Sequence, residues 1–288
     1  RHTDFILSVL AEEWGFVGTS VVIGLYVVLF GRALRIAFSA KDREGTYLVA
    51  GLVAYILLCL MMFVLQRRLQ YFPDPSPMDP AAVGLPQARS ETLTTPDGER
   101  LVIWWVPPRD ASRPVYLYLH GNGANLQARA ERFARIVADG AGLYALSWRG
   151  YGGSTSTPSE AGLMIDARTA YGELVRRVAA DRVLLYGESL GSTVAVMLAA
   201  EVPVRALLLD SSFDSALDVA RRAYPWLPVR WLLRDTFRAD LAAPRVAATV
   251  LMVHCEDDPV TPLDSALVLQ ARLPNARPLH RLRGRCHV

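Results

Sequence analysis

The sequence is poor in cysteine and carries almost no net charge, and each shortage excludes a class of protein. Three cysteines in 288 residues are too few for a disulfide-rich secreted scaffold. Lysine and arginine number 31 against 28 aspartate and glutamate residues, a formal net charge of +3, so nucleic acid is not expected as a partner. Hydrophobic residues make up 52% of the chain, which excludes a disordered protein because there is ample apolar surface to bury.

Charged residues are missing altogether from two long stretches near the N-terminus, residues 14–31 and residues 47–65. Each is close to the ~20 residues that a helix needs to cross ~30 Å of hydrocarbon. A pair of buried core helices is the alternative, but soluble helices of this length normally carry charges on an exposed face. Neither stretch has the short apolar region and small-residue cleavage site of a signal peptide. We therefore predict two transmembrane helices within a membrane region, residues 1–72.

The basic residues around these stretches predict an orientation in the plasma membrane. Four of them lie in the loop between the stretches, whereas one precedes the first stretch and two follow the second. The positive-inside rule places the more basic loop in the cytoplasm. This small difference orients everything after Leu65 toward the outer face.

The remainder of the chain divides into a proline-rich segment and a longer region with regular alternation. Residues 73–89 lack the period of a helix or a strand, and we expect a stiff linker there. Residues 90–288 are enough for one substantial core. Strands are predicted at Arg100–Val106, Val115–Leu119, 143–147, 183–186, 206–209 and 249–253, with helices at 125–138, 161–178, 193–200 and up to residue 273. Such alternation predicts an α/β fold, a mostly parallel sheet with helices on both faces. The apolar interval 214–243 breaks the pattern, either as a cap over an active site or as ordinary helices packed on the sheet.

Residues 187–191 read GESLG, which matches the G-x-S-x-G pattern. The match follows the apolar run VLLY and precedes the helical run STVAVMLAA. In a strand-to-helix turn of this kind both glycines are needed, because side chains there would collide with neighbouring backbone, and the serine hydroxyl is held clear of the sheet. The pattern and its context predict Ser189 as a catalytic nucleophile.

A nucleophilic serine needs a base and an acid that orients the base. In this architecture the acid follows the serine and the histidine comes last. The loop after the predicted strand 249–253 reads HCEDDPVTP. We predict Asp258 as the acid, because it lies where the loop turns away from the strand, with Asp257 as the alternative. A carboxylate that only caps a turn is the structural alternative for Asp258.

Two histidines, His280 and His287, lie downstream of the predicted acid. His280 lies within the strand-like run RPLHRL, where its side chain would pack on a sheet face. His287 follows Gly284 in a loop past that run, where a base can reach over the nucleophile, so we predict His287 as the base. Cys255 and Cys286 adjoin the acid loop and this histidine, and we expect both to be reduced, packed thiols.

A tetrahedral oxyanion needs two backbone N–H donors. We predict Leu190, directly after the nucleophile, as one donor. The loop after Val115–Leu119 reads HGNGAN, and its glycines allow the backbone to approach a substrate closely; Asn122 is the predicted second donor. His120 is interpreted as a residue that shapes this loop and not as the base.

Taken together, the segments LHGNGAN, SWRGYGGS, YGESLGS, HCEDDPVTP and GRCHV resemble the α/β-hydrolase superfamily. From about residue 57 onward the chain is more narrowly similar to the membrane-anchored Bem46/ABHD13/ABHD17-like serine hydrolases, in which a segment such as QRRLQYFPDP follows an anchor helix. The resemblance implies a triad of Ser189, Asp258 and His287, with no metal and no organic cofactor. The family's G-x-G-H-x-D turn is replaced here by GRCHV, and the family's final helix does not follow. We therefore expect a hydrolase domain that is shortened at its C-terminus. The Arg at position 1, in place of Met, separately suggests a fragment or a processed product.

Residues 1 to about 55 resemble a different family. The segments HTDFILSVLAEEWGFVG and RALRIAFSAKDREG are similar to the C-terminal part of RodA/FtsW peptidoglycan polymerases. This resemblance implies an outer loop, a membrane span and a basic cytoplasmic loop; it does not extend to the polymerase activity, because most of that family's spans are missing.

The predicted function is that of a membrane-anchored serine hydrolase that cleaves an ester or thioester through an acyl-enzyme. The apolar interval 214–243 and the membrane region favour a lipid-like or acyl substrate. A serine peptidase or amidase of the same fold is one alternative, since the same triad serves those reactions. A membrane-anchored interaction module without catalysis is the other.

Overall fold

A computed structural model describes residues 28, 31–32, 35–36, 39 and 43–287. The chain divides into two compact units. The first comprises residues 1–66 with 230–232, and the second comprises residues 67–229 with 233–288.

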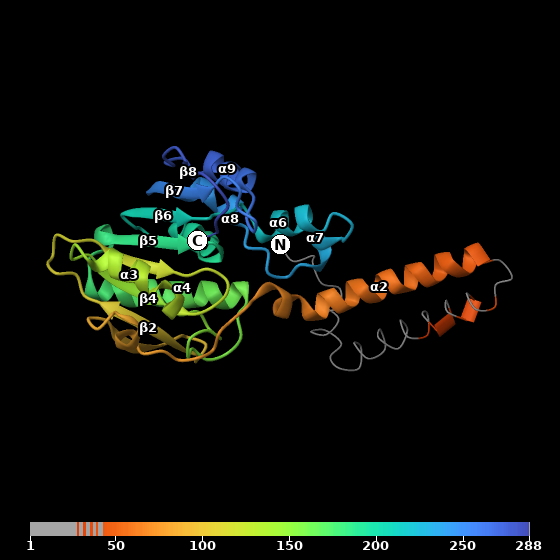
Figure 1. Ribbon diagram of the computed structural model, residues 1–288, viewed down its shortest axis with the longest axis horizontal. Helices are drawn as coiled ribbons and strands as arrows, with labels where there is room; N and C mark the ends of the chain where they lie inside the picture. Colours follow the sequence, from red (N-terminus) through yellow and green to blue (C-terminus); the bar gives the residue numbers. More distant parts are fainter. Residues whose placement is uncertain (1–27, 29–30, 33–34, 37–38, 40–42, 288) are drawn as a thin grey trace. The chain divides into compact units, whose positions relative to one another are not determined.

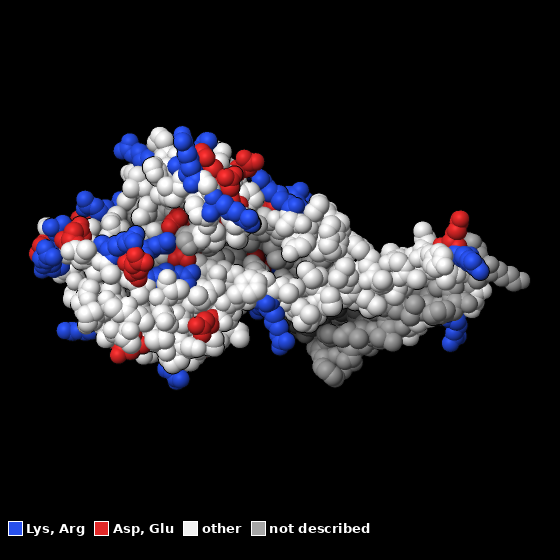
Figure 2. Space-filling view, in the orientation of Figure 1, with Lys and Arg blue, Asp and Glu red and all other residues white. Residues whose placement is uncertain are grey.

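The first unit contains most of a long apolar helix, α2 (Arg43–Gln70). Its charged residues lie only at its two ends: Arg43, Glu44, Arg67 and Arg68 (Figure 2). Within the described residues it is the one helix long and apolar enough to cross a membrane. It includes the predicted second span, residues 47–65. The predicted first span, residues 14–31, falls outside the described residues except for Val28 and Gly31, so the prediction of two transmembrane helices is not confirmed.

The second unit is built on a mostly parallel sheet, as the alternation of strands and helices predicts (Figure 1). The strand order is β1-β2-β4-β3-β5-β6-β7-β8. The first three strands in this order pair antiparallel, and every later pair is parallel. The strands are β1 (Arg89–Thr94), β2 (Arg100–Val106), β3 (Val115–Leu119), β4 (Gly142–Leu146), β5 (Val183–Glu188), β6 (Ala206–Asp210), β7 (Thr249–Cys255) and β8 (His280–Leu282).

Helices cover both faces of this sheet. Successive side chains of a strand point to opposite faces, and here both sets are apolar and need to be buried. In β2, Leu101 and Ile103 enter the larger core, whereas Trp104 and Val106 enter the smaller one. The larger core also contains side chains of four helices: α4 (Glu160–Arg177), α5 (Leu190–Ala199), α8 (Ala239–Ala242) and α9 (Leu263–Arg272). The smaller core contains Phe133 of α3 (Ala130–Val137).

The proline-rich segment 73–89 packs on the smaller core. Asp79 caps a short 3₁₀ helix, η1 (Pro80–Val83), by accepting a hydrogen bond from the backbone N–H of Ala81. Leu85 is fully buried, in the same cluster as Trp104. The segment therefore contains local structure that its composition did not predict. A proline suits the first position of a helix, and Leu85 and Ala88 bury part of the segment in the smaller core.

The apolar interval 214–243 contains α6 (Ala216–Ala223), α7 (Val229–Leu232) and α8. Ala239 and Ala242 of α8 are buried in the larger core, so this part of the interval is ordinary helix packing. The segment between α6 and α7 differs, because Tyr224 and Trp226 are exposed.

Candidate active site

Ser189 lies in the turn between β5 and α5, with φ +48° and ψ −115°. A non-glycine residue in this region costs on the order of 1–3 kcal/mol, and such strain persists only where the surroundings enforce it. The two flanking glycines show how the surroundings enforce this backbone conformation of Ser189. A Cβ at Gly187 would lie 2.5 Å from Cα of Ser192, and a Cβ at Gly191 would run into the carbonyl oxygen of Leu119. Only glycines let α5 start this close to the sheet.

Three residues that lie far apart in the sequence meet at this turn. Nε2 of His287 lies 3.0 Å from Oγ of Ser189, and Nδ1 of His287 lies 2.8 Å from Oδ2 of Asp258. An ionised carboxylate only accepts hydrogen bonds, so Nδ1–H donates to Asp258. Nε2 is then left to accept the hydroxyl proton of Ser189. The structure thus brings together the three residues that the sequence predicts as nucleophile, acid and base.

Asp258 is held in place by its own loop. Its Oδ1 accepts hydrogen bonds from the backbone N–H groups of Val260, at 2.8 Å, and Thr261, at 2.9 Å. Its Oδ2 also accepts the hydroxyl of Thr261, at 2.9 Å. Burial raises the pKa of Asp258, but the hydrogen bonds from His287 and this loop outweigh burial and lower the pKa below its ordinary value. Asp258 therefore stays ionised and fixes the tautomer of His287.

The alternatives for acid and base lie elsewhere. Asp257 is exposed, and its backbone N–H donates to the carbonyl of Gly284 at 3.2 Å. His280 is exposed on β8. Neither side chain has a hydrogen bond to Ser189 in the described part of the chain.

The loop HGNGAN packs directly against the nucleophile turn. A Cβ at Gly121 would lie 2.8 Å from Oε1 of Glu188 and 3.2 Å from Cβ of Ser189. Asn122, whose backbone N–H is the predicted second oxyanion donor, is held by its side chain. Its Oδ1 accepts the hydroxyl of Tyr151 at 2.9 Å and the backbone N–H of Phe72 at 3.1 Å, and its Nδ2 donates to the carbonyl of Gln70. These three hydrogen bonds fix the position of Asn122 in the loop. Leu190 is the first residue of α5, so its N–H has no acceptor within that helix.

His120 shapes this loop. It is fully buried, its Nδ1–H donates to the carbonyl of Gly121 at 2.7 Å, and its Nε2 accepts the backbone N–H of Trp148 at 3.3 Å. Burial, with a smaller contribution from the charge of Arg129, lowers the pKa of His120 to about 3. The ring is neutral and both of its nitrogens are occupied.

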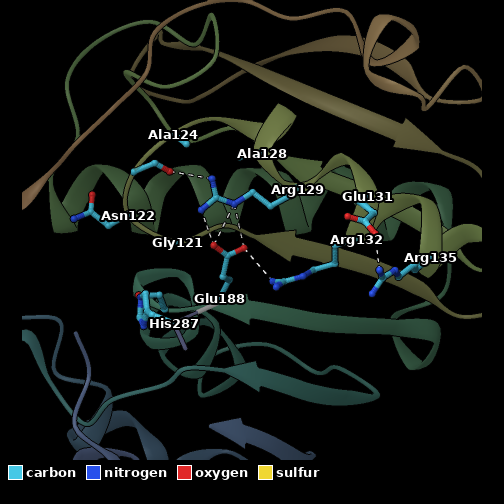
Figure 3. Close-up of a pocket in the computed structure, with 12 residues that line it drawn as sticks. Gly121, Asn122, Ala124, Ala128, Arg129, Glu131, Arg132, Arg135, Glu188 and His287 are labelled. Carbon is cyan, nitrogen blue, oxygen red and sulfur yellow. Dashed lines mark hydrogen bonds and ion pairs between the residues drawn. The ribbon is translucent and has the colours of Figure 1, made fainter. Parts of the chain in front are cut away.

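The sequence did not predict a buried ion pair beside Ser189 (Figure 3). Nη2 of Arg129 lies 2.5 Å from Oε1 of Glu188. Nη1 of the same guanidinium donates to the carbonyls of Gly123, at 2.9 Å, and Asn125, at 3.0 Å. Glu188 also accepts the hydroxyl of Tyr118 and lies 3.3 Å from Nη1 of Arg132. Burial would raise the pKa of Glu188, but the hydrogen bonds and charge of Arg129, with smaller contributions from Tyr118 and Arg132, lower it to about 2. The Glu188–Arg129 pair therefore ties the HGNGAN loop to the residue before the nucleophile. A glutamate inside G-x-S-x-G was the available signal, since a buried carboxylate requires a partner.

A pocket of about 470 Å³ opens beside these groups. It is bounded by the HGNGAN loop on one side and by the residues leading into and along α3 on the other (Figure 3). Its lining mixes small residues with charged ones: Gly121, Asn122, Gly123, Ala124, Ala128, Arg129, Glu131, Arg132, Arg135, Glu188, Ser189 and His287. Space for a substrate thus exists next to Ser189 and His287.

The expectation of two reduced thiols beside the site was wrong. Cys255 and Cys286 form a disulfide, with their Cα atoms 5.7 Å apart, within the usual range for such a bond. The sequence placed the two residues 31 positions apart. They are close because β8 runs parallel to β7 and ends beside it, with Leu282 opposite Cys255.

Similarity to known proteins agrees with this architecture. Residues 114–247 match the family model of the α/β hydrolase fold. The chain is 38% identical over 233 residues to the uncharacterized protein Rv2307c of Mycobacterium tuberculosis, which covers 78% of this chain and 83% of that protein. It is 38% identical over 121 residues to protein bem46 of Schizosaccharomyces pombe, 40% of each chain. It is also 31% identical over 180 residues to the lysophosphatidylserine lipase ABHD12 of Gallus gallus, 56% of this chain and 47% of that one.

Among solved structures, an esterase of Pyrococcus furiosus, Pf2001, superposes with a TM-score of 0.61 over 75% of this chain and 91% of that one, at 17% identity. This likeness concerns the fold. The chain belongs to the α/β-hydrolase family and is of the Bem46 type. Residues 1–67 match a second family model, that of the FtsW/RodA/SpoVE cell cycle proteins, as the resemblance of the N-terminal segment predicted.

Proposed function

We propose that the protein is a membrane-anchored serine hydrolase that cleaves an ester or thioester through Ser189, His287 and Asp258. The observation that carries the proposal is the continuous chain of hydrogen bonds from Oγ of Ser189 through His287 to Asp258. A triad is recognised by such geometry and by the roles of its members. As an α/β hydrolase, the protein has the fold in which this arrangement recurs.

In the proposed reaction, Oγ of Ser189 attacks the acyl carbon while Nε2 of His287 takes the hydroxyl proton. The oxyanion is stabilised by the backbone N–H groups of Leu190 and Asn122. Collapse of the intermediate expels the alcohol or thiol, which takes the proton back from His287. Water, activated by the same histidine, then releases the acid from Ser189.

The proposed substrate is a lipid-like or small acyl ester. The membrane-length helix α2 would hold the enzyme near such a substrate, and the similarity to a lysophosphatidylserine lipase favours this class. The charged half of the pocket, with Arg132 and Arg135, suits a polar alcohol portion better than a second alkyl chain.

We further propose the predicted organisation of the chain: a membrane region at 1–72, the proline-rich segment 73–89 and a hydrolase domain at 90–288. The hydrolase domain would lie on the outer face of the membrane. The positive-inside argument supports this side, and so does the Cys255–Cys286 disulfide, because disulfides persist in oxidising compartments.

The proposal is tested with a fluorophosphonate probe on the full chain in detergent. We expect labelling that disappears in Ser189→Ala and persists in Ser112→Ala, a change at an exposed serine on another loop. Activity is then compared on p-nitrophenyl esters of short and long acyl chains and on a matched anilide. Folded protein that neither reacts with the probe nor hydrolyses an ester is the result expected of a non-catalytic module. A preference for the anilide would identify an amidase.

A further inference from the structure

The disulfide lies between the two elements that carry the proposed acid and base. Cys255 is the last residue of β7, three positions before Asp258, and it is buried. Cys286 immediately precedes His287 and is exposed. The bond between them therefore joins the strand that leads to Asp258 to the residue next to His287.

Few other contacts hold the chain between β8 and His287. β8 has only three residues, all of them exposed, at the edge of the sheet. Beyond it, the carbonyl of Gly284 accepts a backbone hydrogen bond from Asp257 at 3.2 Å. Within the described part of the chain, the disulfide is the one side-chain bond of residues 283–286, since none of them has a side-chain hydrogen bond or an ion pair.

We propose that the Cys255–Cys286 disulfide positions His287 and that hydrolase activity therefore depends on the thiol redox state; this inference rests on the proposed function. The imidazole must meet Ser189 and Asp258 at the same time, at 3.0 and 2.8 Å. A covalent link at the preceding residue confines the backbone of His287 close to the end of β7. Among the described residues, the other restraints on this segment are the short edge strand, the backbone hydrogen bonds from Glu256 to Leu282 and from Asp257 to Gly284, and the two hydrogen bonds of the imidazole itself. A displacement of about 1 Å at a catalytic group costs on the order of 10²-fold in rate.

The switching chemistry needs an external dithiol. A thiolate of the dithiol attacks Sγ of Cys286, the exposed partner, because the sulfur of Cys255 is buried. A mixed disulfide forms and the thiolate of Cys255 leaves and is protonated. The second thiol of the reductant then attacks the mixed disulfide, releases Cys286 as a thiol and leaves the reductant as a cyclic disulfide. Two electrons and two protons pass from the dithiol to the protein.

The experiment measures kcat and KM for a p-nitrophenyl ester on the full chain in detergent, before and after treatment with dithiothreitol, with thiols counted by mass spectrometry. We expect kcat to fall on the order of 10²-fold after reduction and KM to change less than about threefold, because most of the pocket lining is contributed by the HGNGAN loop and α3. Reoxidation should restore kcat. Cys59→Ser should respond like the wild type, since Cys59 is a free cysteine in α2.

The variant Cys255→Ser/Cys286→Ser should have the low kcat of the reduced protein and should no longer respond to dithiothreitol. Thermal unfolding of oxidised and reduced protein separates positioning from loss of fold. A fully reduced protein with unchanged kcat overturns the inference, and so does a fall in kcat that merely follows the unfolded fraction. If the oxidised wild type itself lacks Ser189-dependent activity, the proposed function fails instead.

Discussion

The Glu188–Arg129 pair offers the sharpest test of how this site is held together. Arg129→Met removes the guanidinium that contacts the buried carboxylate of Glu188, whose side chain is only 3% exposed. The same substitution removes the donors to the carbonyls of Gly123 and Asn125. We expect the substitution to destabilise the fold and to displace the HGNGAN loop.

The magnitude follows from the pKa of Glu188. Burial alone would raise it, but Arg129 and its neighbours lower it from 4.5 to about 2. At about 1.4 kcal/mol for each tenfold change in an acid dissociation constant, this difference corresponds to about 3 kcal/mol for all partners of Glu188 together. In Arg129→Met, Glu188 keeps the hydroxyl of Tyr118 and the guanidinium of Arg132, so about 3 kcal/mol is the upper limit of the loss. For a domain of this size we expect the Tm of Arg129→Met to fall by at most roughly 6–12 °C.

The catalytic effect should match the loss of one oxyanion donor, on the order of 10²–10³ in kcat, because the HGNGAN loop loses its link to the nucleophile turn. The matched control is Arg176→Met, which lies outside the pocket. The side chain of Arg176 is 79% exposed and pairs with Glu173 within α4, so we expect less than about 1 kcal/mol and unchanged ester hydrolysis. The assays are thermal unfolding and ester hydrolysis.

The pH dependence has a definite sign. A carboxylate whose pKa is lowered by folding stabilises the protein above its ordinary pKa, and this contribution is lost as the pH falls through the folded value. The Glu188 contribution should therefore be complete above about pH 5 and disappear between about pH 4.5 and pH 2. Glu188→Gln should lack this part of the acid dependence. An Arg129→Met protein as stable and as active as the Arg176→Met control would refute the reasoning.

Two further predictions concern the proposed acid and the segment after α2. Asp258→Asn should lower kcat by on the order of 10³–10⁴, because the amide no longer holds His287 in the required tautomer. Asp257→Asn, at an exposed neighbour, should stay within about twofold, and equal losses in steady-state assays would contradict the assignment. A chain that begins at residue 90 should be less stable and lose on the order of 10²-fold in kcat relative to one that begins at residue 67, because it lacks Leu85 of the smaller core and the backbone of Gln70 and Phe72 that holds Asn122. Identical stability and activity of the two proteins would show that this support is dispensable.

Local patterns in the sequence predicted most strands of the sheet and the turn at Ser189. The strands Arg100–Val106 and Val115–Leu119 have the predicted bounds, because both are covered on both faces of the sheet and are therefore nearly continuous apolar runs with turn residues at their ends. The turn at Ser189 was predicted equally well from the sequence, because close approach of the backbone requires glycine at positions 187 and 191. The 3₁₀ helix at Pro80–Val83 was not predicted, because the Asp79 cap and one buried residue, Pro80, make no repeating pattern.

Other features depend on which segments the fold brings together. Sequence order and loop position favoured Asp258 and His287, but only the parallel pairing of β8 with β7 places their side chains 2.8 Å apart. The same pairing brings Cys286 to Cys255, which the spacing of three cysteines did not predict. Arg129 gave no signal of its own, because an arginine near a helix start is usually solvated; burial of Glu188 gives it a partner. Short-range steric requirements and hydrophobic periodicity involve neighbouring residues, so they can be recognised in the sequence. The pairing of charges, thiols and proposed catalytic groups depends on long-range packing, which brings distant residues together and removes them from water.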